Sequence, residues 1–452
     1  MPNFTDKLVD HFYEISNKPL SKLQEKLCRL RLLDYYGVAL AGSKILEKEL
    51  LGYISFTGTS EGSASVLGTS LKTSPDQAAL LNGMSAHVAE LDDGDRFGMV
   101  HPGAPVISAV LSIVQARQLK MVDLLRGINA GYEACVQLAC LMQPAMKDRG
   151  YHATGICGAV GAAIGVASAC GFDRERMKST FSAAITSSSG ILKVIRGSSK
   201  LKPYNAGQAA LNGLTAARVA ASGLLGPTDV MEGDQGFYCM MTGSSLIPEL
   251  SELKPVNAVG RVYIKPYAAC RHCHAPIDAT LKIRSISAVK SEEIDSIQVR
   301  THRYAVYLHD HVEIEGSASA KMSVPYSVAV SLITGRAGMH EFSDAYVSNT
   351  EVMRLARKVI MIADDELTAL VPAKRAAIVE IKTLQGTVYS ERVDLPKGEP
   401  ENPVTEEELI KKFYDLAVFS GKTLDIVKEE ARILVDTDIR ILLTQAGVRI
   451  GY

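Results

Sequence analysis

The sequence contains no tryptophan, few other aromatic residues and almost no net charge. Aromatic residues make up 6% of the 452 positions, and the formal net charge is −1. A near-neutral chain offers no electrostatic basis for binding nucleic acid or an anionic membrane, so we expect neither partner. Apolar residues account for 47% of the chain, which suits a globular core. The length predicts two or three domains.

Long hydrophobic runs are missing as well. The first stretch, MPNFTDKLVDHFYEISNKPL, mixes charges and lacks the apolar segment of a secretory signal. The most apolar run, TGICGAVGAAIGVASAC at 154–170, is short for a membrane span and rich in weakly hydrophobic glycine and alanine, which predicts a buried helix. Eight scattered cysteines without a signal are typical of reduced thiols, so we expect a cytoplasmic protein.

Helix signals dominate the first 250 or so residues. Ser74, Pro75 and Gln77 supply helix-start chemistry at the head of SPDQAALLNGMSAHVAEL. Small residues recur through 154–170 and 204–224, which would let helices approach closely. We find no internal repeat and no low-complexity tract.

Strand signals begin after Pro248. VGRVYIKPY (259–267) and IDSIQVRTH (294–302) are rich in β-branched and aromatic residues, and both predict strands. A hairpin is predicted at 376–393, turning at Gln385-Gly386. With helical stretches such as PYSVAVSLITG between them, these segments predict a smaller α+β domain.

The last part of the chain returns to helix. The proline-rich segment LPKGEPENPV (395–404) predicts a linker. Thr405 and Glu408 then match a capping box. We expect the tail to Tyr452 to be helical and to pack on the first domain.

The segment IKPYAACRHCHAP (264–276) interleaves Cys270 and Cys273 with His272 and His274. A structural zinc site needs four ligands, commonly from two knuckles, and no second CxxC exists in the chain. A redox CxxC would need a thioredoxin-like βαβ unit, which the surrounding pattern lacks.

The third interpretation of this segment is an anion site at a strand end. Lys265 and Arg271 supply cationic donors, and arginine can hold a carboxylate with two hydrogen bonds. An exposed basic turn is the alternative. In the anion-site interpretation, the two cysteines are small buried fillers and His274 orients its neighbours.

A second cluster lies in HVAELDDGDRFGMVHPGAP (87–105), which contains two histidines and the acidic residues Glu90, Asp92, Asp93 and Asp95. The spacing does not match an EF-hand. A histidine near carboxylates can act as a general acid or base, and His101 follows a loop, where functional residues concentrate. The alternative is a solvated acidic helix end followed by a turn.

Three further residues are candidates. His152 precedes a small-residue helix whose N-terminus could attract an anion. Lys202, in GSSKLKPYNAGQAA, could bind a carboxylate or could be an ordinary surface lysine. Tyr326 opens an apolar helix and could donate a proton, although core tyrosines are commoner.

Taken together, four segments resemble the MmgE/PrpD family in their order and spacing: AHVAELDDGDRFGMVHPG, GYHATGICGAVGAA, KLKPYNAGQAA and KPYAACRHCHAPIDA. This family includes 2-methylcitrate dehydratase, cis-aconitate decarboxylase and iminodisuccinate epimerase. The resemblance implies a mainly α fold, with a large all-helical domain (1–254 plus 400–452) and an inserted smaller α+β lid domain (255–399). It also implies a homodimer and a site between the two domains that uses no metal and no organic cofactor.

The resemblance carries over His101, His152, Lys202, Lys265 and Tyr326 as site residues, and the chemistry of the same motifs adds the other candidates. The catalytic candidates are His101, His152, Tyr326 and Asp93. The substrate-binding candidates are Lys202, Lys265, Arg271, Asp92, His272 and His274. The cations would stabilise charge that develops beside a carboxylate, while the histidines and the tyrosine exchange protons.

These roles predict a lyase that removes water from a small hydroxylated di- or tricarboxylate, as 2-methylcitrate dehydratase does. The alternatives are an epimerase of the iminodisuccinate type, a decarboxylase of the cis-aconitate type, and a non-catalytic helical dimer that binds polycarboxylates. Residues Glu90–Gly94 replace the D-F-[DN]-D-T pattern usual in the dehydratases and decarboxylases. The sequence therefore leaves the substrate open.

Overall fold

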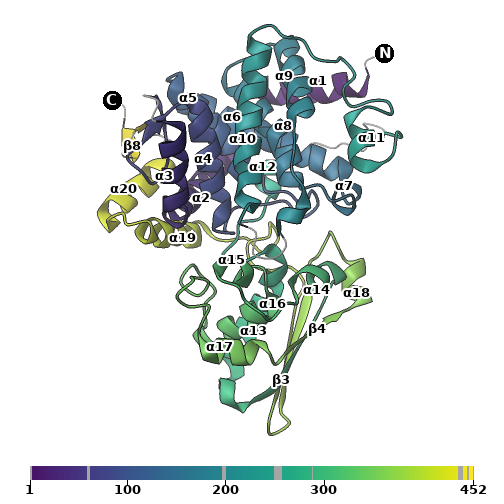
Figure 1. Cartoon of the computed structure of the whole chain (residues 1–452), viewed down its shortest axis with the longest axis vertical. Coiled ribbons are helices and arrows are strands. Elements are labelled where there is room, and N and C mark those ends of the chain that lie inside the picture. The colour runs from purple at the N-terminus through teal and green to yellow at the C-terminus, as the bar shows by residue number, and fades with distance from the viewer. Residues whose placement is uncertain are drawn as a thin grey trace. The chain divides into compact units, whose positions relative to one another are not determined.

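The computed structural model describes residues 3–58, 62–195, 200–248, 257–287, 289–435, 441–444 and 447–450. It is mainly helical, with a small mixed sheet towards the C-terminal part of the chain, which confirms the predicted fold class (Figure 1). The chain divides into two compact units. Unit 1 comprises Met1–Ile195, Leu201–Val262 and Thr405–Tyr452, and unit 2 comprises Arg196–Lys200 and Tyr263–Val404.

Unit 1 is built almost entirely from helices. They are α1 (Phe4–Asn17), α2 (Lys22–Ile45), α3 (Glu47–Thr57), α4 (Pro75–Val88), α5 (Gly103–Ala116), α6 (Met121–Met142), α7 (Ala145–Asp148), α8 (Ala153–Ala169), α9 (Arg174–Ser187), α10 (Lys202–Ala221), α11 (Phe237–Thr242), α12 (Ala258–Arg261), α19 (Glu406–Phe419) and α20 (Leu424–Val435). A short 3-10 helix, η1, covers Leu192–Ile195. Ser74 caps α4 by accepting from the backbone N–H of Gln77, as the helix-start pattern predicts.

The core of unit 1 depends on small residues. Every residue of α8 is buried, and α8 packs against α6 and α10, while α10 also packs against α4 (Figure 1). A Cβ added at Gly131 on α6 would lie 2.7 Å from the carbonyl oxygen of Gly161 on α8. Contacts this close leave no room for a side chain, so the small-residue pattern produces close helix packing.

Unit 1 departs from the predicted all-helical domain in two places. Short strands β1 (Ala64–Ser65) and β2 (Lys72–Thr73) pair between α3 and α4. The predicted helical tail is confirmed for α19 and α20, but helix to Tyr452 is wrong, because strands β7 (Ile441–Thr444) and β8 (Gly447–Ile450) pair antiparallel beyond them. The β-branched residues Ile441, Thr444, Val448 and Ile450 in these two segments favour strands.

Unit 2 combines a four-stranded sheet with helices. The strands are β3 (Ile294–Thr301), β4 (Val359–Ala363), β5 (Ala377–Thr383) and β6 (Val388–Val393), in the order β4-β3-β5-β6. β3 is parallel to β4, and the other two pairings are antiparallel. The helices are α13 (Arg271–Ser287), α14 (Arg303–His309), α15 (Ser317–Ala320), α16 (Val324–Thr334), α17 (Thr350–Ala356) and α18 (Asp365–Ala369), with a 3-10 turn η3 at Ser291–Glu293. The predicted strand at 294–302 and the predicted hairpin are confirmed.

One strand prediction in this region is wrong. Residues 259–267 do not form a strand; α12 ends within them and a loop follows. The CRHCH segment then opens helix α13 and does not lie at a strand end. The β-branched residues there are instead buried, and Val259 and Val262 accept hydrogen bonds from Arg31 through their carbonyl groups. Tertiary packing therefore overrides local β-propensity here.

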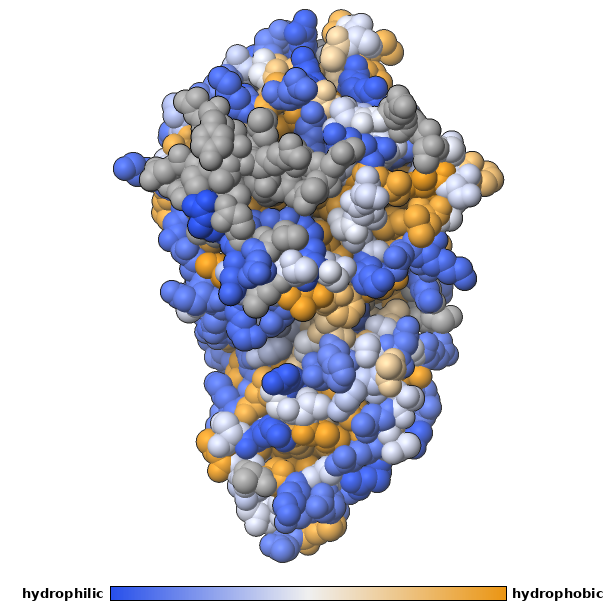
Figure 2. Space-filling model, turned by 90° about the vertical axis from the view of Figure 1, so that its left-hand side faces the viewer, coloured by the Kyte–Doolittle hydropathy of each residue, from blue (hydrophilic) through white to orange (hydrophobic). Residues whose placement is uncertain are grey.

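On the face drawn in Figure 2, hydrophilic residues are interspersed with patches of hydrophobic residues. Within the described part of the chain, no helix combines the length and the apolar character needed to cross a membrane.

Candidate functional site

Two histidine rings contact one carboxylate in unit 1, and a third ring lies next to one of them. His87, in the last turn of α4, lies with its Nδ1 2.6 Å from Oδ2 of Asp92. The Nδ1 atom of His101 lies 3.4 Å from the same oxygen. The rings of His87 and His101 meet edge to face with centroids 5.2 Å apart, and the ring of His152 is 6.2 Å from that of His87. A shared carboxylate stabilises positive charge on either neighbouring imidazole.

The backbone fixes the tautomer of His101. Its Nδ1 lies 2.6 Å from the carbonyl oxygen of Asp93, and because a carbonyl can only accept, Nδ1 carries the hydrogen. The neutral ring therefore has its lone pair on Nε2. His101 immediately precedes Pro102 and the N-terminus of α5, and its side chain is 15% exposed.

The side chain of Asp93 points to other partners. It accepts a hydrogen bond from the Gly103 N–H at 3.0 Å and one from the Tyr132 hydroxyl at 2.7 Å. Burial raises the pKa of the Asp93 carboxyl to about 7, against smaller opposing effects of Arg31 and Tyr132. The backbone carbonyl of Asp93 therefore orients His101, and the side chain of Asp93 fixes the start of α5.

His152 is held as a neutral ring. It caps α8, and its Nδ1 accepts a hydrogen bond from the amide nitrogen of Asn205 at 2.9 Å. The same amide also donates to the Ile191 carbonyl, which fixes its orientation. Burial lowers the pKa of His152 well below its ordinary value, and the neighbouring His87, Lys202 and His101 lower it further. The hydrogen of His152 therefore lies on Nε2, where it can be donated.

Lys202, the first residue of α10, pairs with Glu90. Both side chains are largely buried, with exposed fractions of 12% and 6%. Glu90 occupies the position at which the sequence departs from the usual family pattern, and it has a left-handed backbone with φ of 56°. The pair links the acidic loop of residues 90–95 to α10, beside His152.

In unit 2, Arg271 was predicted to bind substrate, but its guanidinium group forms hydrogen bonds within the protein. Its Nε and Nη2 donate to one oxygen of Glu399, at 3.1 and 2.8 Å. The remaining hydrogens go to His274 Nδ1 and to the carbonyls of Lys397 and Pro396, so all five guanidinium donors are used. Arg271 therefore ties the start of α13 to the 396–399 segment.

The other residues of unit 2 that were predicted to belong to the site lie in different surroundings. His274 is buried, and its Nε2 donates to the Ala269 carbonyl at 3.1 Å. Lys265 is fully buried in the loop before α13. The Tyr326 hydroxyl donates to the Glu341 carbonyl at 2.7 Å, and burial raises its pKa. His272 belongs to a separate group of histidines, described below.

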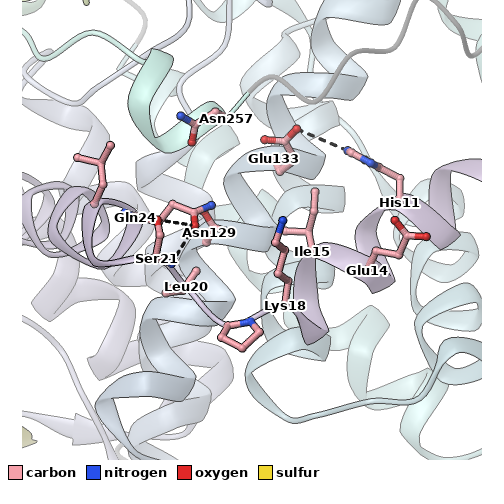
Figure 3. A pocket seen from close by; sticks show the side chains of 12 residues that line it. His11, Glu14, Ile15, Lys18, Leu20, Ser21, Gln24, Asn129, Glu133 and Asn257 are labelled. Atoms are coloured by element: carbon pink, nitrogen blue, oxygen red, sulfur yellow. Dashed lines mark hydrogen bonds and ion pairs between the residues drawn. The ribbon is translucent and has the colours of Figure 1, made fainter.

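A distinct cavity of about 390 Å³ lies in unit 1 between α1, the α1–α2 connection and α6 (Figure 3). His11 and Glu133 both line it, with His11 Nε2 3.5 Å from Glu133 Oε1, and Asn129 and Lys18 also line it. None of the residues predicted for the site lines this cavity.

Two residues of the unit 1 cluster were not predicted. His87 lies in the HVAELDD segment, five residues before Asp92. The clustering of histidine and acidic residues in that segment was the signal that could have identified it. Asn205 lies in the KPYNAG segment, but nothing local indicates that its amide orients a histidine 53 residues earlier.

Comparison with known proteins places these features in a family. The MmgE/PrpD N-terminal domain model matches residues 6–249, and the C-terminal domain model matches residues 267–439. A cis-aconitate decarboxylase of Aspergillus terreus is 24% identical over 418 residues, covering 85% of this chain and 83% of that protein. The human cis-aconitate decarboxylase is 23% identical, covering 84% and 81%. A cis-aconitate decarboxylase-like protein, oryM, of Aspergillus oryzae is 24% identical over 99% and 96%. The chain therefore belongs to the MmgE/PrpD family.

Proposed function

We propose that this protein is a lyase that decarboxylates a small unsaturated di- or tricarboxylate of the cis-aconitate class. The observation that carries the proposal is that the partners of the two Nδ1 atoms leave Nε2 of His101 to exchange a proton and Nε2–H of His152 to donate a hydrogen bond, with Asp92 Oδ2 3.4 Å from Nδ1 of His101. The relatives named as cis-aconitate decarboxylases favour decarboxylation over the dehydration that led the sequence-based prediction.

In the proposed reaction, the bond between carbon and the departing carboxylate breaks, CO₂ leaves, and the electron pair stays on the substrate. A neighbouring carboxylate group delocalises this charge, and the Nε2–H of His152 stabilises it by donating a hydrogen bond. Protonated His101, supported by Asp92, delivers the proton from Nε2 to carbon and returns to its neutral form. The product has one carboxyl group fewer and one new C–H bond.

Loss of water is the second candidate, because the same two histidines suit an elimination. Neutral His101 has its lone pair on Nε2 and could remove a proton next to a carboxylate. A proton donor would then assist departure of the hydroxyl group. The two reactions differ in their first step, so the substrate that is consumed distinguishes them.

The test is a substrate panel with the purified full-length protein: cis-aconitate, citrate, 2-methylcitrate, malate, tartrate and iminodisuccinate, followed by proton NMR and CO₂ release. We expect CO₂ in equal amount to a new vinyl product from an unsaturated substrate. A vinyl product without CO₂ would favour dehydration. Solvent deuterium entering an unchanged compound would favour epimerisation, and silence across the panel would contradict the proposal.

A further inference from the structure

A second histidine cluster lies in unit 2, apart from the unit 1 histidines in sequence. Cys270, His272 and His309 each offer one ligand atom, and these atoms all lie within 4.8 Å of one another. The ring of His272 is 5.0 Å from that of His309 and 5.0 Å from that of His302. His302 and His309 stand at the two ends of α14, and both are buried.

We infer that Cys270, His272 and His309 form a binding site for a transition metal, with Zn²⁺ the best fit. One thiolate and two imidazoles are the ligand types that zinc prefers, whereas hard ions such as Mg²⁺ and Ca²⁺ need oxygen ligands. Zn–S and Zn–N bonds at a tetrahedral angle place the two ligand atoms about 3.6 Å apart. The Cys270 Sγ and His309 Nε2 atoms are 3.7 Å apart.

The tautomer of His309 supports this site. Its Nδ1 lies 2.7 Å from the Met322 carbonyl oxygen, which can only accept, so Nδ1 carries the hydrogen and Nε2 presents its lone pair towards Cys270. An outer hydrogen bond from the other ring nitrogen is the usual way in which proteins orient a metal-ligating histidine.

The same backbone segment positions the thiol. The N–H of Cys270 donates to the Lys321 carbonyl at 2.8 Å, one residue before the carbonyl that holds His309. Two ligands separated by 39 positions in the sequence are therefore aligned by two consecutive peptide groups. Such alignment lowers the ordering cost of binding a metal.

Metal binding would have a definite local consequence. Binding replaces the hydrogen of the Cys270 thiol by the metal and releases one proton. The metal would connect the residue preceding α13 to the last residue of α14, and so fix the start of α13, where Arg271 and His274 lie. Three protein ligands leave a fourth position for water or His302. No step of the proposed reaction is routed through this site.

The test uses chelator-treated full-length protein titrated with Co²⁺ and then Zn²⁺. We expect about one metal per chain, a thiolate-to-cobalt charge-transfer band that Zn²⁺ abolishes, and a rise in melting temperature with Zn²⁺. Cys270→Ser should remove the band, and His309→Gln should weaken binding at least about tenfold. Circular dichroism checks that each variant is folded.

Cys273→Ser is the matched control, because it removes the other thiol of the CxxC pair, which lies outside the cluster. It should keep the band and the affinity. Absence of the band in the wild type, its persistence in Cys270→Ser, or wild-type binding by His309→Gln would overturn the inference. Loss of the band in folded Cys273→Ser would also overturn this ligand set, in favour of a CxxC knuckle.

Discussion

At the scale of the residue, the unit 1 site is defined by which nitrogen of each histidine carries its hydrogen. Nδ1 of His101 donates to a backbone carbonyl, and Nδ1 of His152 accepts from an amide. In the neutral rings, Nε2 of His101 therefore has a lone pair, whereas Nε2 of His152 carries a hydrogen. Asp92 holds two of the three rings. The sequence assigned the roles of proton acceptor and proton donor to the histidines jointly, and these hydrogen bonds distinguish the two residues.

The Asp92→Asn substitution tests whether the Asp92 carboxylate orients and stabilises the histidines of this cluster. An asparagine keeps the size but loses the charge and one acceptor, and its amide would favour the wrong tautomer of His87 or His101. We expect kcat to fall by about 100-fold or more with a smaller change in KM, measured on the substrate found in the panel. Asp415→Asn is the control, because Asp415 is exposed and pairs only locally with Lys411. Equal kcat values for the two variants would contradict the account.

A pH experiment tests the neutral state of His152. Its folded-state pKa lies well below 6.5, so the unfolded chain binds a proton there that the folded chain does not. The contribution of His152 to stability is therefore present above about pH 6.5 and is lost as the pH falls towards the folded-state pKa. In urea unfolding between pH 5.5 and 7.5, His152→Gln should show a shallower loss of stability on acidification than the wild type. Identical slopes would contradict a depressed pKa.

At the scale of the element, the start of α5 links fold and site. Gly103 follows His101 and Pro102, and a Cβ there would lie 2.7 Å from Asp93 Oδ1 and 2.8 Å from the Tyr132 hydroxyl. These contacts explain why this position carries glycine. The hydrogen bonds of Asp93 to Gly103 and Tyr132 then hold the loop whose carbonyl orients His101.

Gly103→Ala should accordingly destabilise the fold and the site together. Relieving the contacts requires a shift of Asp93 or Tyr132, and we expect a loss of about 1–3 kcal/mol in the free energy of unfolding, with reduced activity. Gly52→Ala in α3 is the control, because nothing lies within 4 Å of its added Cβ. That variant should be neutral or more stable by up to about 1 kcal/mol. Equal effects in denaturant unfolding would show that the α5 contacts do not matter.

Local signals explain which elements the sequence predicts. The start of α4 at Ser74 and the hairpin around Gly386 follow from capping and turn chemistry within a few residues. Thr405 likewise forms its capping box with Glu408. The segment 259–267 failed because its β-branched residues are used for burial, which depends on partners more than 200 positions away, such as Arg31.

In both sites, residue types could be predicted from the sequence, whereas their hydrogen-bond partners could not. The histidines and lysines could be proposed from their motifs. The engagement of Arg271 by Glu399, 128 residues away, could not be read from the KPYAACRHCH segment, and neither could the role of Asn205. Residue type is visible in a sequence, but the partner that fixes a tautomer or occupies a guanidinium is a property of the fold.

At the scale of the whole molecule, the family resemblance predicts a homodimer. Light scattering on the purified chain should give twice the mass of one chain at micromolar concentration, because stable interfaces of standard size bury about 1,600 Å² and persist on dilution. Gel filtration over a hundredfold dilution series is the companion measurement. A mass of one chain at every concentration would rule the dimer out.

In the proposed reaction, His101 exchanges a proton with a carboxylate substrate. The most direct test is proton NMR of the reaction in D₂O with wild type, His101→Gln and His11→Gln, where His11 is a control histidine paired with Glu133 in the separate cavity. We expect one deuterium at the reacting carbon of the wild-type product and an unchanged rate for His11→Gln. For His101→Gln we expect a rate at least about 100-fold lower. A His101→Gln rate within a few fold of wild type would show that His101 does not transfer the proton.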